Sequence, residues 1–292
     1  MQFKGVITSL ITPFKGEVID VEGLRENISF QIKNGVNGLL VGGTTGEAPT
    51  LDLDEYELLI QTTAHVCGGQ LPLIVSVGES ATKRSLIKME MATTWGADAL
   101  LVATPAYNRP SQEGLYQHFK TIANMSKLPV ILYNNPIRTG VSIELSTLMR
   151  LTKIDGIAGI KESSGVIQTA QDILYHLPRH LTFLSGEDRL ILPLMASGAG
   201  GVISVLSNLM PKQIVEFVQL ILDQDIEQAR KKERALYPFF QACSFETNPV
   251  PIKTMMNLLG RAAGGFRLPL TSLKQANIER LETLLDLKAS PI

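Results

Sequence analysis

Short runs of valine, isoleucine and leucine recur along the first two thirds of the chain, and helix-like segments separate them. The runs are almost continuously apolar, which is typical of parallel strands covered on both faces. They occupy residues 6–13, 38–43, 73–78, 99–104, 130–134, 157–161, 181–185 and 201–205. The segments between them, such as residues 24–33 and 55–66, carry apolar residues at helical spacing.

Eight strands alternating with helices predict an α/β fold, the (β/α)8 or TIM barrel. An open doubly wound sheet is the competing fold, but no GxGxxG motif follows the first strand. After residue 224 the chain reads as helices, at residues 225–245, 250–259 and 273–285. We expect a barrel catalytic domain over 1–224 and a C-terminal helical domain over 225–292. That second part is either a lid or oligomer contact, or packing against the barrel wall.

Composition narrows the class of protein. The 292 residues are 45% hydrophobic, and 27 basic residues nearly balance 28 acidic ones. No field of one sign is available for nucleic acid or an anionic membrane, so neither is expected as a partner. Two cysteines without CxxC spacing, Cys67 and Cys243, fit a reducing compartment. The N-terminal residues lack a signal-peptide pattern, and no apolar stretch is long enough to span a bilayer. We therefore expect a cytoplasmic protein.

The ends of the predicted strands carry the candidate chemistry, because active sites of such barrels lie at the carboxyl ends of the strands. Lys161 closes the apolar run at 157–161. Burial favours the neutral amine, which a Schiff-base nucleophile needs. A lysine that reaches out to solvent or pairs with Glu162 is the alternative. Tyr133 lies on the preceding strand, at residues 130–134, and could move protons during imine formation, or be an ordinary barrel aromatic.

Two further segments suggest that the ligand carries carboxylates. Residues 42–47, GGTTGE, can turn backbone N–H groups inward around an anion, with the hydroxyls of Thr44 and Thr45 beside it. No lysine follows as in a P-loop, so a carboxylate fits better than a nucleotide phosphate. Arg138 follows Tyr133 by five residues and offers a planar fork for a second carboxylate, unless it is solvated at the surface.

Metal and cofactor chemistry finds no support in the sequence. His176 and His180 are separated by Pro178 and lie at no strand end. Other clusters of histidine and acidic residues are missing, so metal-dependent aldol chemistry is not expected, and no cofactor is expected either.

The ordered set of motifs resembles the dihydrodipicolinate synthase family, within the pyruvate-dependent class I aldolases. The resemblance runs from Thr12-Pro13-Phe14 to the segment NPVPIK at 248–253, essentially end to end. Its specific pieces are GTTGE at 43–47, TPAYNRPSQEGLYQHF at 104–119, YNNPIRTG at 133–140 and GIKESSG at 159–165. The resemblance implies the condensation of pyruvate with L-aspartate 4-semialdehyde, and a homodimer or homotetramer built as a dimer of dimers.

The resemblance also assigns roles residue by residue. Lys161 would form the imine with pyruvate, and Tyr133 would donate and accept protons. Thr44 and Tyr107 would complete a hydroxyl relay, with Tyr107 supplied across a dimer interface. The other implied contacts are Thr45 to the pyruvate carboxylate, Arg138 to the semialdehyde carboxylate, and the backbones of Gly186 and Ile203 beside the lysine.

Lysine feedback is expected to be weak or absent. Lysine-inhibited members carry an aromatic residue before the relay tyrosine, where this chain has Ala106. Three further contact positions match Ser80, Arg84 and Tyr56, which depart from the asparagine, acidic residue and histidine of those members. A cationic Arg84 would repel the ammonium groups of lysine.

Three other functions stay open on the sequence. Sialic-acid lyases and keto-deoxy sugar acid aldolases share the lysine and tyrosine, but usually show a GSTGE-like loop and lack the arginine. A catalytically inactive barrel used for binding or regulation is the alternative of another class. A phosphate-sugar enzyme fits less well, since no basic cradle follows strands seven and eight.

Overall fold

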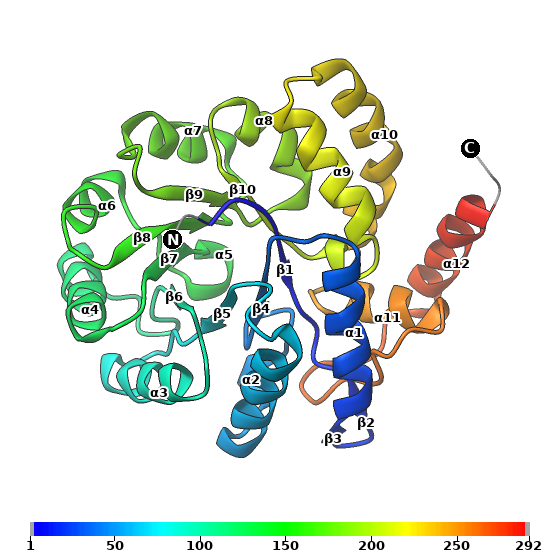
Figure 1. Cartoon of the computed structure of the whole chain (residues 1–292), viewed down its shortest axis with the longest axis horizontal. Helices are drawn as coiled ribbons and strands as arrows, with labels where there is room; N and C mark the ends of the chain where they lie inside the picture. The colour runs from blue at the N-terminus through cyan, green and yellow to red at the C-terminus, as the bar shows by residue number, and fades with distance from the viewer. Residues whose placement is uncertain (1–2, 290–292) are drawn as a thin grey trace.

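The computed structural model describes residues 3–289, with side chains to residue 286. Its centre is a closed barrel of eight parallel strands in the order β1-β10-β9-β8-β7-β6-β5-β4, which confirms the predicted TIM barrel (Figure 1). The strands are β1 Gly5–Ser9, β4 Gly38–Val41, β5 Leu73–Ser76, β6 Ala99–Ala103, β7 Val130–Asn134, β8 Ile157–Glu162, β9 Thr182–Ser185 and β10 Gly201–Ser204.

Helices surround the barrel in chain order. They are α1 Val21–Lys33, α2 Leu53–Cys67, α3 Thr82–Thr94, α4 Gln112–Met125, α5 Pro136–Thr139, α6 Leu145–Leu151, α7 Ile167–His176, α8 Ile191–Ala196 and α9 Pro211–Leu222, with single 3₁₀ turns η1 Ala48–Thr50, η2 Asp188–Leu190 and η3 Leu206–Asn208. A small antiparallel hairpin, β2 Phe14–Lys15 and β3 Val18–Ile19, follows β1 and was not predicted.

Three helices follow the barrel: α10 Ile226–Ala242, α11 Val250–Leu258 and α12 Gln275–Ala289. Figure 1 shows α10 against α9, and α11 with α12 beyond α1. The predicted boundary at residue 224 falls in the short link between α9 and α10; whether the two parts are separate domains stays a prediction. No helix within residues 3–289 has the length and apolar character that crossing a membrane requires.

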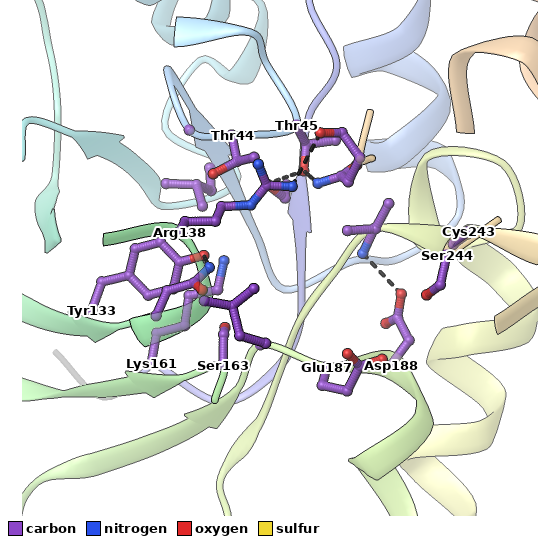
Figure 2. Close-up of a pocket in the computed structure, with 18 of the residues that line it drawn as sticks. Thr44, Thr45, Tyr133, Arg138, Lys161, Ser163, Glu187, Asp188, Cys243 and Ser244 are labelled. Carbon is purple, nitrogen blue, oxygen red and sulfur yellow. Dashed lines mark hydrogen bonds between the residues drawn. The ribbon is translucent and has the colours of Figure 1, made fainter. Parts of the chain in front are cut away.

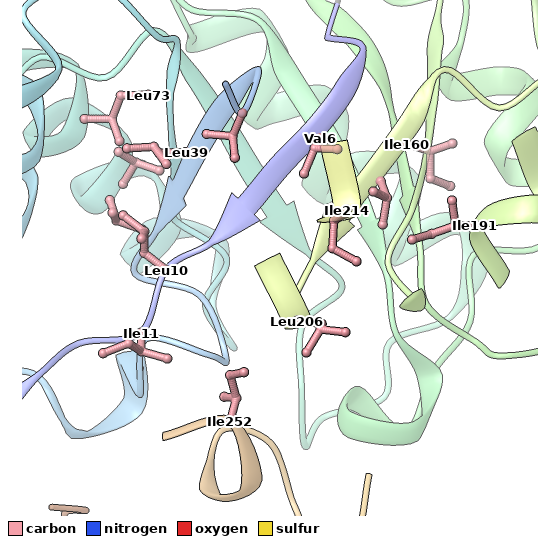
Figure 3. Packing of buried hydrophobic residues seen from close by; sticks show 14 of the residues in the cluster. Val6, Leu10, Ile11, Leu39, Leu73, Ile160, Ile191, Leu206, Ile214 and Ile252 are labelled. Carbon is pink, nitrogen blue, oxygen red and sulfur yellow. The ribbon is translucent and has the colours of Figure 1, made fainter. Parts of the chain in front are cut away.

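The apolar residues form two layers. The larger one fills the space between strands and helices, and Figure 3 shows Val6 of β1 near Ile214 of α9 and Ile160 of β8 near Ile191 of α8. The smaller one lies inside the barrel and consists of Phe3, Ile7, Leu40, Ile74, Ala99, Leu101, Ile131, Tyr133, Leu184 and Ile203. This interior plug closes the barrel, so the open space lies at the ends of the strands.

Strand β8 contains one extra residue relative to β7. Val130 pairs with Ile157 but Ile131 pairs with Gly159, so Ala158 has no partner across the ladder. Beyond this bulge Tyr133 pairs with Lys161. Side chains of paired residues on parallel strands share a face, so Lys161 points to the same side as Tyr133, into the barrel.

The segment after β4 is fixed at both ends. Glu47 adopts a left-handed backbone, with φ 55°, and its backbone N–H donates to the Thr44 carbonyl. Helix α2 then begins at a capping box, in which the Asp52 side chain accepts from the Glu55 N–H at 2.9 Å and Glu55 returns the bond. The GGTTGE turn is therefore followed, after the 3₁₀ turn η1, by a helix whose N-terminus is capped.

Candidate active site

A cavity of about 260 Å³ opens at the carboxyl ends of the strands. It is lined by Thr44, Thr45, Tyr133, Arg138, Lys161 and Gly186, six of the eight predicted site residues, together with residues of the C-terminal segment that follows α10. Figure 2 shows Lys161, Tyr133 and Ser163 at one side, Thr44 and Thr45 at another, and Glu187 and Asp188 at a third. The structure thus brings most of the predicted residues together.

Lys161 lies in this cavity with 6% of its surface exposed. Its Nζ lies 4.4 Å from the centre of the Tyr133 ring. Among residues 3–289 it makes no hydrogen bond to a carboxylate or carbonyl; in particular the Glu162 carboxylate is occupied by Asn134 at 2.7 Å and by the Ser164 N–H at 2.5 Å. The alternative of a lysine paired with Glu162 is therefore not what the structure shows.

Gly186 makes room for the lysine. A methyl group at this position would lie 1.8 Å from the Ser163 Oγ and 2.8 Å from the Lys161 Cε. Its own N–H donates to the Glu162 carbonyl at 2.8 Å, which fixes the end of β9 beside the end of β8. Any larger residue at position 186 would have to displace the Lys161 side chain.

Tyr133 is held by polar neighbours within the cavity. Asn135 Nδ2 donates to its phenolic oxygen at 2.7 Å. Burial acts to raise the pKa of the Tyr133 phenol, but the charge of Lys161 and the polar contacts of the phenol, with the Asn135 hydrogen bond among them, outweigh it. The pKa of Tyr133 therefore lies below its ordinary value, which makes the phenol a readier proton donor.

The GGTTGE turn has the form of an anion site. Thr45 is 2% exposed and lines the cavity, and its hydroxyl accepts from Ser9 Oγ at 3.1 Å and from Asn248 Nδ2 at 3.0 Å. The backbone N–H groups of Thr44 and Thr45 have no acceptor among the described residues. Two adjacent free N–H groups beside a hydroxyl can receive a carboxylate.

Arg138 lies on the short helix α5 and reaches across the cavity. Its Nη2 donates to the Asn248 carbonyl at 3.3 Å and lies 3.5 Å from the Thr247 Oγ1. These bonds are long and the side chain is exposed, so the guanidinium can turn to a ligand.

Two predicted residues do not line the cavity. Tyr107 is 91% exposed, with a left-handed backbone at φ 71°. Ile203 is 1% exposed and belongs to the barrel interior. The predicted roles of both stay predictions.

Sequence reasoning missed several residues of the site. Ser163, Asp188, Ser244 and Asn248 line the cavity. Asp188 accepts from the backbone N–H groups of Val205 and Leu206 at 3.0 and 2.9 Å, and burial raises its pKa to about 6. Asp188 follows the end of β9 by three residues and could have been found by reading further along each strand end.

Metal-binding groups are sparse in the part of the chain that the structure describes. No three histidine, cysteine or acidic side chains converge there as a metal site would require. His176 ends α7 and its Nδ1 contacts the Asp172 carbonyl at 2.8 Å.

Comparisons with known proteins agree with this geometry. Residues 2–288 match the model of the dihydrodipicolinate synthetase family. The chain is 41% identical over 284 residues to the 4-hydroxy-tetrahydrodipicolinate synthase of Methanocaldococcus jannaschii, covering 97% of this chain and 98% of that one. Crystal structures of dihydrodipicolinate synthases are also similar. That of Aquifex aeolicus has a TM-score of 0.96 at 40% identity, and that of Thermotoga maritima 0.97 at 37%, each covering 99% of both chains.

Proposed function

The chain belongs to the dihydrodipicolinate synthetase family, and from this premise we propose how its cavity carries out the family's reaction. The enzyme condenses pyruvate with L-aspartate 4-semialdehyde to 4-hydroxy-tetrahydrodipicolinate, in the biosynthesis of diaminopimelate and lysine (EC 4.3.3.7). The observation that carries the assignment of the chemistry is Lys161, a buried lysine that faces the cavity and forms no ion pair within the part of the chain that the structure describes.

Lys161 is the nucleophile in this proposal. Its neutral amine attacks C2 of pyruvate, a carbon–nitrogen bond forms, and the carbonyl oxygen leaves as water. Tyr133, at van der Waals range of the Lys161 amine, supplies and recovers the protons of these steps. Loss of a methyl proton then gives the enamine, whose terminal carbon attacks the aldehyde. The amino group of the aldehyde substrate finally displaces Lys161 and closes the ring.

Two anion sites orient the substrates. We assign the pyruvate carboxylate to Thr45 and the free N–H groups of its turn, and the carboxylate of the semialdehyde to Arg138. Arg138 shares a contact residue, Asn248, with the turn, and its own hydrogen bonds are long. Holding both carboxylates leaves the enamine and the aldehyde facing each other.

The cavity of one chain lacks the third hydroxyl of the proposed relay. Tyr107 is exposed and does not line the cavity of its own chain, so we propose that a second copy supplies it to Thr44 and Tyr133 in a dimer or dimer of dimers. Sedimentation velocity should give a dimer or larger species. In that assembly Tyr107→Phe should lower kcat without dissociating it, and a fully active monomer would contradict the proposal.

We also propose that lysine inhibits the enzyme weakly, but for a reason other than the charge of Arg84. Ala106 and Ser80 line a second cavity of about 490 Å³, beside the first, but Arg84 and Tyr56 do not. Tyr56 is buried and donates to the Ser76 carbonyl. The cationic residues of that cavity are Lys88, which is paired with Glu79, and Arg138, and their charges oppose an ammonium ligand. Assays with millimolar lysine should show little inhibition; strong inhibition would contradict this.

The imine is the decisive test. The protein is incubated with pyruvate, reduced with borohydride, digested and analysed by mass spectrometry. The adduct should map to Lys161 and be absent from Lys161→Met. Lys253, the other deeply buried lysine among the side chains that the structure describes, is the internal control and should stay unmodified. An adduct elsewhere, or none on folded protein, would overturn the proposed role of Lys161.

A further inference from the structure

The hydroxyl of Thr45 has both of its acceptor positions filled. Ser9 Oγ donates to it at 3.1 Å and Asn248 Nδ2 donates to it at 3.0 Å. A hydroxyl has two lone pairs and a single hydrogen, so only its own O–H remains to be used. Because both lone pairs are used, the Thr45 hydroxyl can act toward a ligand only as a hydrogen-bond donor.

The hydroxyl hydrogen of Thr45 has no acceptor among the described residues. No oxygen of residues 3–289 accepts a hydrogen bond from the Thr45 Oγ1, and the residue lines the cavity. The free N–H groups of Thr44 and Thr45 belong to the same turn. The Thr45 hydroxyl and these two N–H groups form a set of three hydrogen-bond donors that is in place before a ligand binds. Such preorganisation lowers the entropic cost of binding an anion.

Asn248 also contacts the second anion-binding group. Its carbonyl accepts from Arg138 Nη2 at 3.3 Å, and its side chain lines both cavities. One residue therefore touches both Thr45 and Arg138, although it lies 203 positions from Thr45 in the sequence.

The position of Asn248 is secured by a buried ion pair. Lys253, on helix α11, donates to the Glu47 carboxylate at 2.6 Å, and both side chains have 0% exposure. Glu47 ends the GGTTGE turn, and Lys253 follows Asn248 by five residues. The turn and the start of α11 are thus joined twice, by Asn248–Thr45 and by Lys253–Glu47.

We propose that Asn248 is a positioning residue, which fixes the Thr45 hydroxyl as a hydrogen-bond donor to the carboxylate of pyruvate. The proposal rests on the assignment of that carboxylate to the Thr45 turn. Asn248 does not touch the reacting atoms; it acts through the direction of one hydrogen bond.

Asn248→Asp and Asn248→Ala separate this role from simple packing. Aspartate has nearly the shape of asparagine but can only accept, so it would take the Thr45 hydrogen and place a negative charge beside the carboxylate. Half-saturation by pyruvate is measured by borohydride trapping on Lys161 without the aldehyde, which leaves Arg138 out of the readout. We expect it to rise on the order of 10-fold in Asn248→Ala and on the order of 100-fold in Asn248→Asp. The melting temperature should order the variants differently, with the better space-filling aspartate at least as stable as alanine.

Asn257→Ala is the matched control. Asn257 lies on α11, the helix that begins two residues after Asn248, and its side-chain amide bonds both the N–H and the carbonyl of Gly264, outside the lining of the cavity. Its loss should leave half-saturation by pyruvate unchanged. If Asn248→Asp does not fold, Asn248→Ala and Asn257→Ala are compared alone. The pyruvate concentration at half-saturation should then rise in Asn248→Ala and stay unchanged in Asn257→Ala.

The outcomes distinguish this inference from the proposed function. A wild-type protein that forms no adduct on Lys161 would refute the function itself. Normal trapping in the wild type, with pyruvate binding in Asn248→Asp equal to or tighter than in Asn248→Ala, would overturn the positioning role alone. An unshifted Asn248→Ala would do the same.

Discussion

Two buried lysines occupy neighbouring regions of this molecule, and their surroundings are opposite. At the start of α11, Lys253 donates to the Thr12 carbonyl, the Glu47 carboxylate and the Gly265 carbonyl, at 3.0, 2.6 and 2.6 Å. Every N–H of an ammonium group is thereby used. At the end of β8, Lys161 is nearly as buried, yet it meets a tyrosine ring and open cavity.

The comparison teaches that burial alone does not make a nucleophile. Burial lowers the pKa of Lys253, but the Glu47 charge acts the other way, and three acceptors hold the side chain in place. Such a group stabilises structure and cannot turn to a substrate. Lys161 has no competing acceptor among the described residues, so its nitrogen is available to react. The two lysines therefore differ in their hydrogen-bond partners and not in how deeply they are buried.

The largest expected effect comes from Lys161→Met, which removes the reacting nitrogen. We expect kcat to fall by a factor on the order of 10³ or more, as loss of a covalent nucleophile does. Stability should hold or rise, because Lys161 gives up no hydrogen bond and methionine fits a buried position. Steady-state assays and thermal melting check both parts. A large loss of stability would show that Lys161 carries structure as Lys253 does.

Tyr133→Phe should lower kcat by about 10² to 10⁴, the range for losing a proton-transfer group. Tyr133 also reports on the charge beside it. Because the Lys161 charge acts to lower the pKa of Tyr133, that pKa should rise in Lys161→Met. Ultraviolet difference titration of the phenol measures it, with Tyr133→Phe to identify the signal. An unchanged titration would mean that the two groups do not sense each other.

Lys253→Met should unfold more easily by about 3–5 kcal/mol, since it leaves the Glu47 carboxylate buried without a partner. The double variant Lys253→Met/Glu47→Gln removes both charges and should recover most of that loss. Urea unfolding measures the free energies. Equal stabilities of the single and double variants would show that the charge pair is not what matters.

Asp188→Asn extends the comparison to a buried carboxyl group. Burial raises the pKa of Asp188 from 3.8 to about 6, so the folded state binds its proton more tightly than the unfolded chain. The associated stability is fully present below pH 4 and is lost as pH rises through 6, by about 3 kcal/mol at most.

In Asp188→Asn this pH dependence should disappear. The stability of the variant relative to wild type should therefore rise between pH 4 and 6 and level off above, as measured by urea unfolding at several pH values. Asn257→Asp, which adds a carboxyl group at an exposed site, serves as the control. A difference that stays constant with pH would show that Asp188 is charged throughout.

The barrel and the reacting pair could be predicted because their signals are local. Each strand is a short apolar run, and Lys161 and Tyr133 each stand at the end of one. The C-terminal contacts could not be predicted in this way. Asn248 and Lys253 meet the GGTTGE turn across more than 200 residues of chain, and neither periodicity nor spacing relates the two segments.

Other features depend on context that one sequence does not carry. The hairpin β2–β3 has two residues in each strand, too few to show alternation. Tyr107 was assigned to the site by resemblance, but one chain leaves it exposed, and its role depends on a second copy. Gly186 has no property of its own to mark it, since its function is the space that it leaves for Lys161 and Ser163.

The bulge at Ala158 decides which face of β8 the Lys161 side chain occupies. Before it, Ile157 faces the helices; after it, Lys161 faces the cavity, although the two are four positions apart and would share a face in a regular strand. Deletion of Ala158 would leave Ile157 and Lys161 three positions apart, on opposite faces of a regular strand, so Lys161 would still face the cavity. A regular strand that kept Ala158 in the alternation would instead turn Lys161 toward the helices, with every residue of the site present and the nucleophile out of reach of pyruvate. The direction of Lys161 thus depends on the irregularity itself and not on the residue type that forms it.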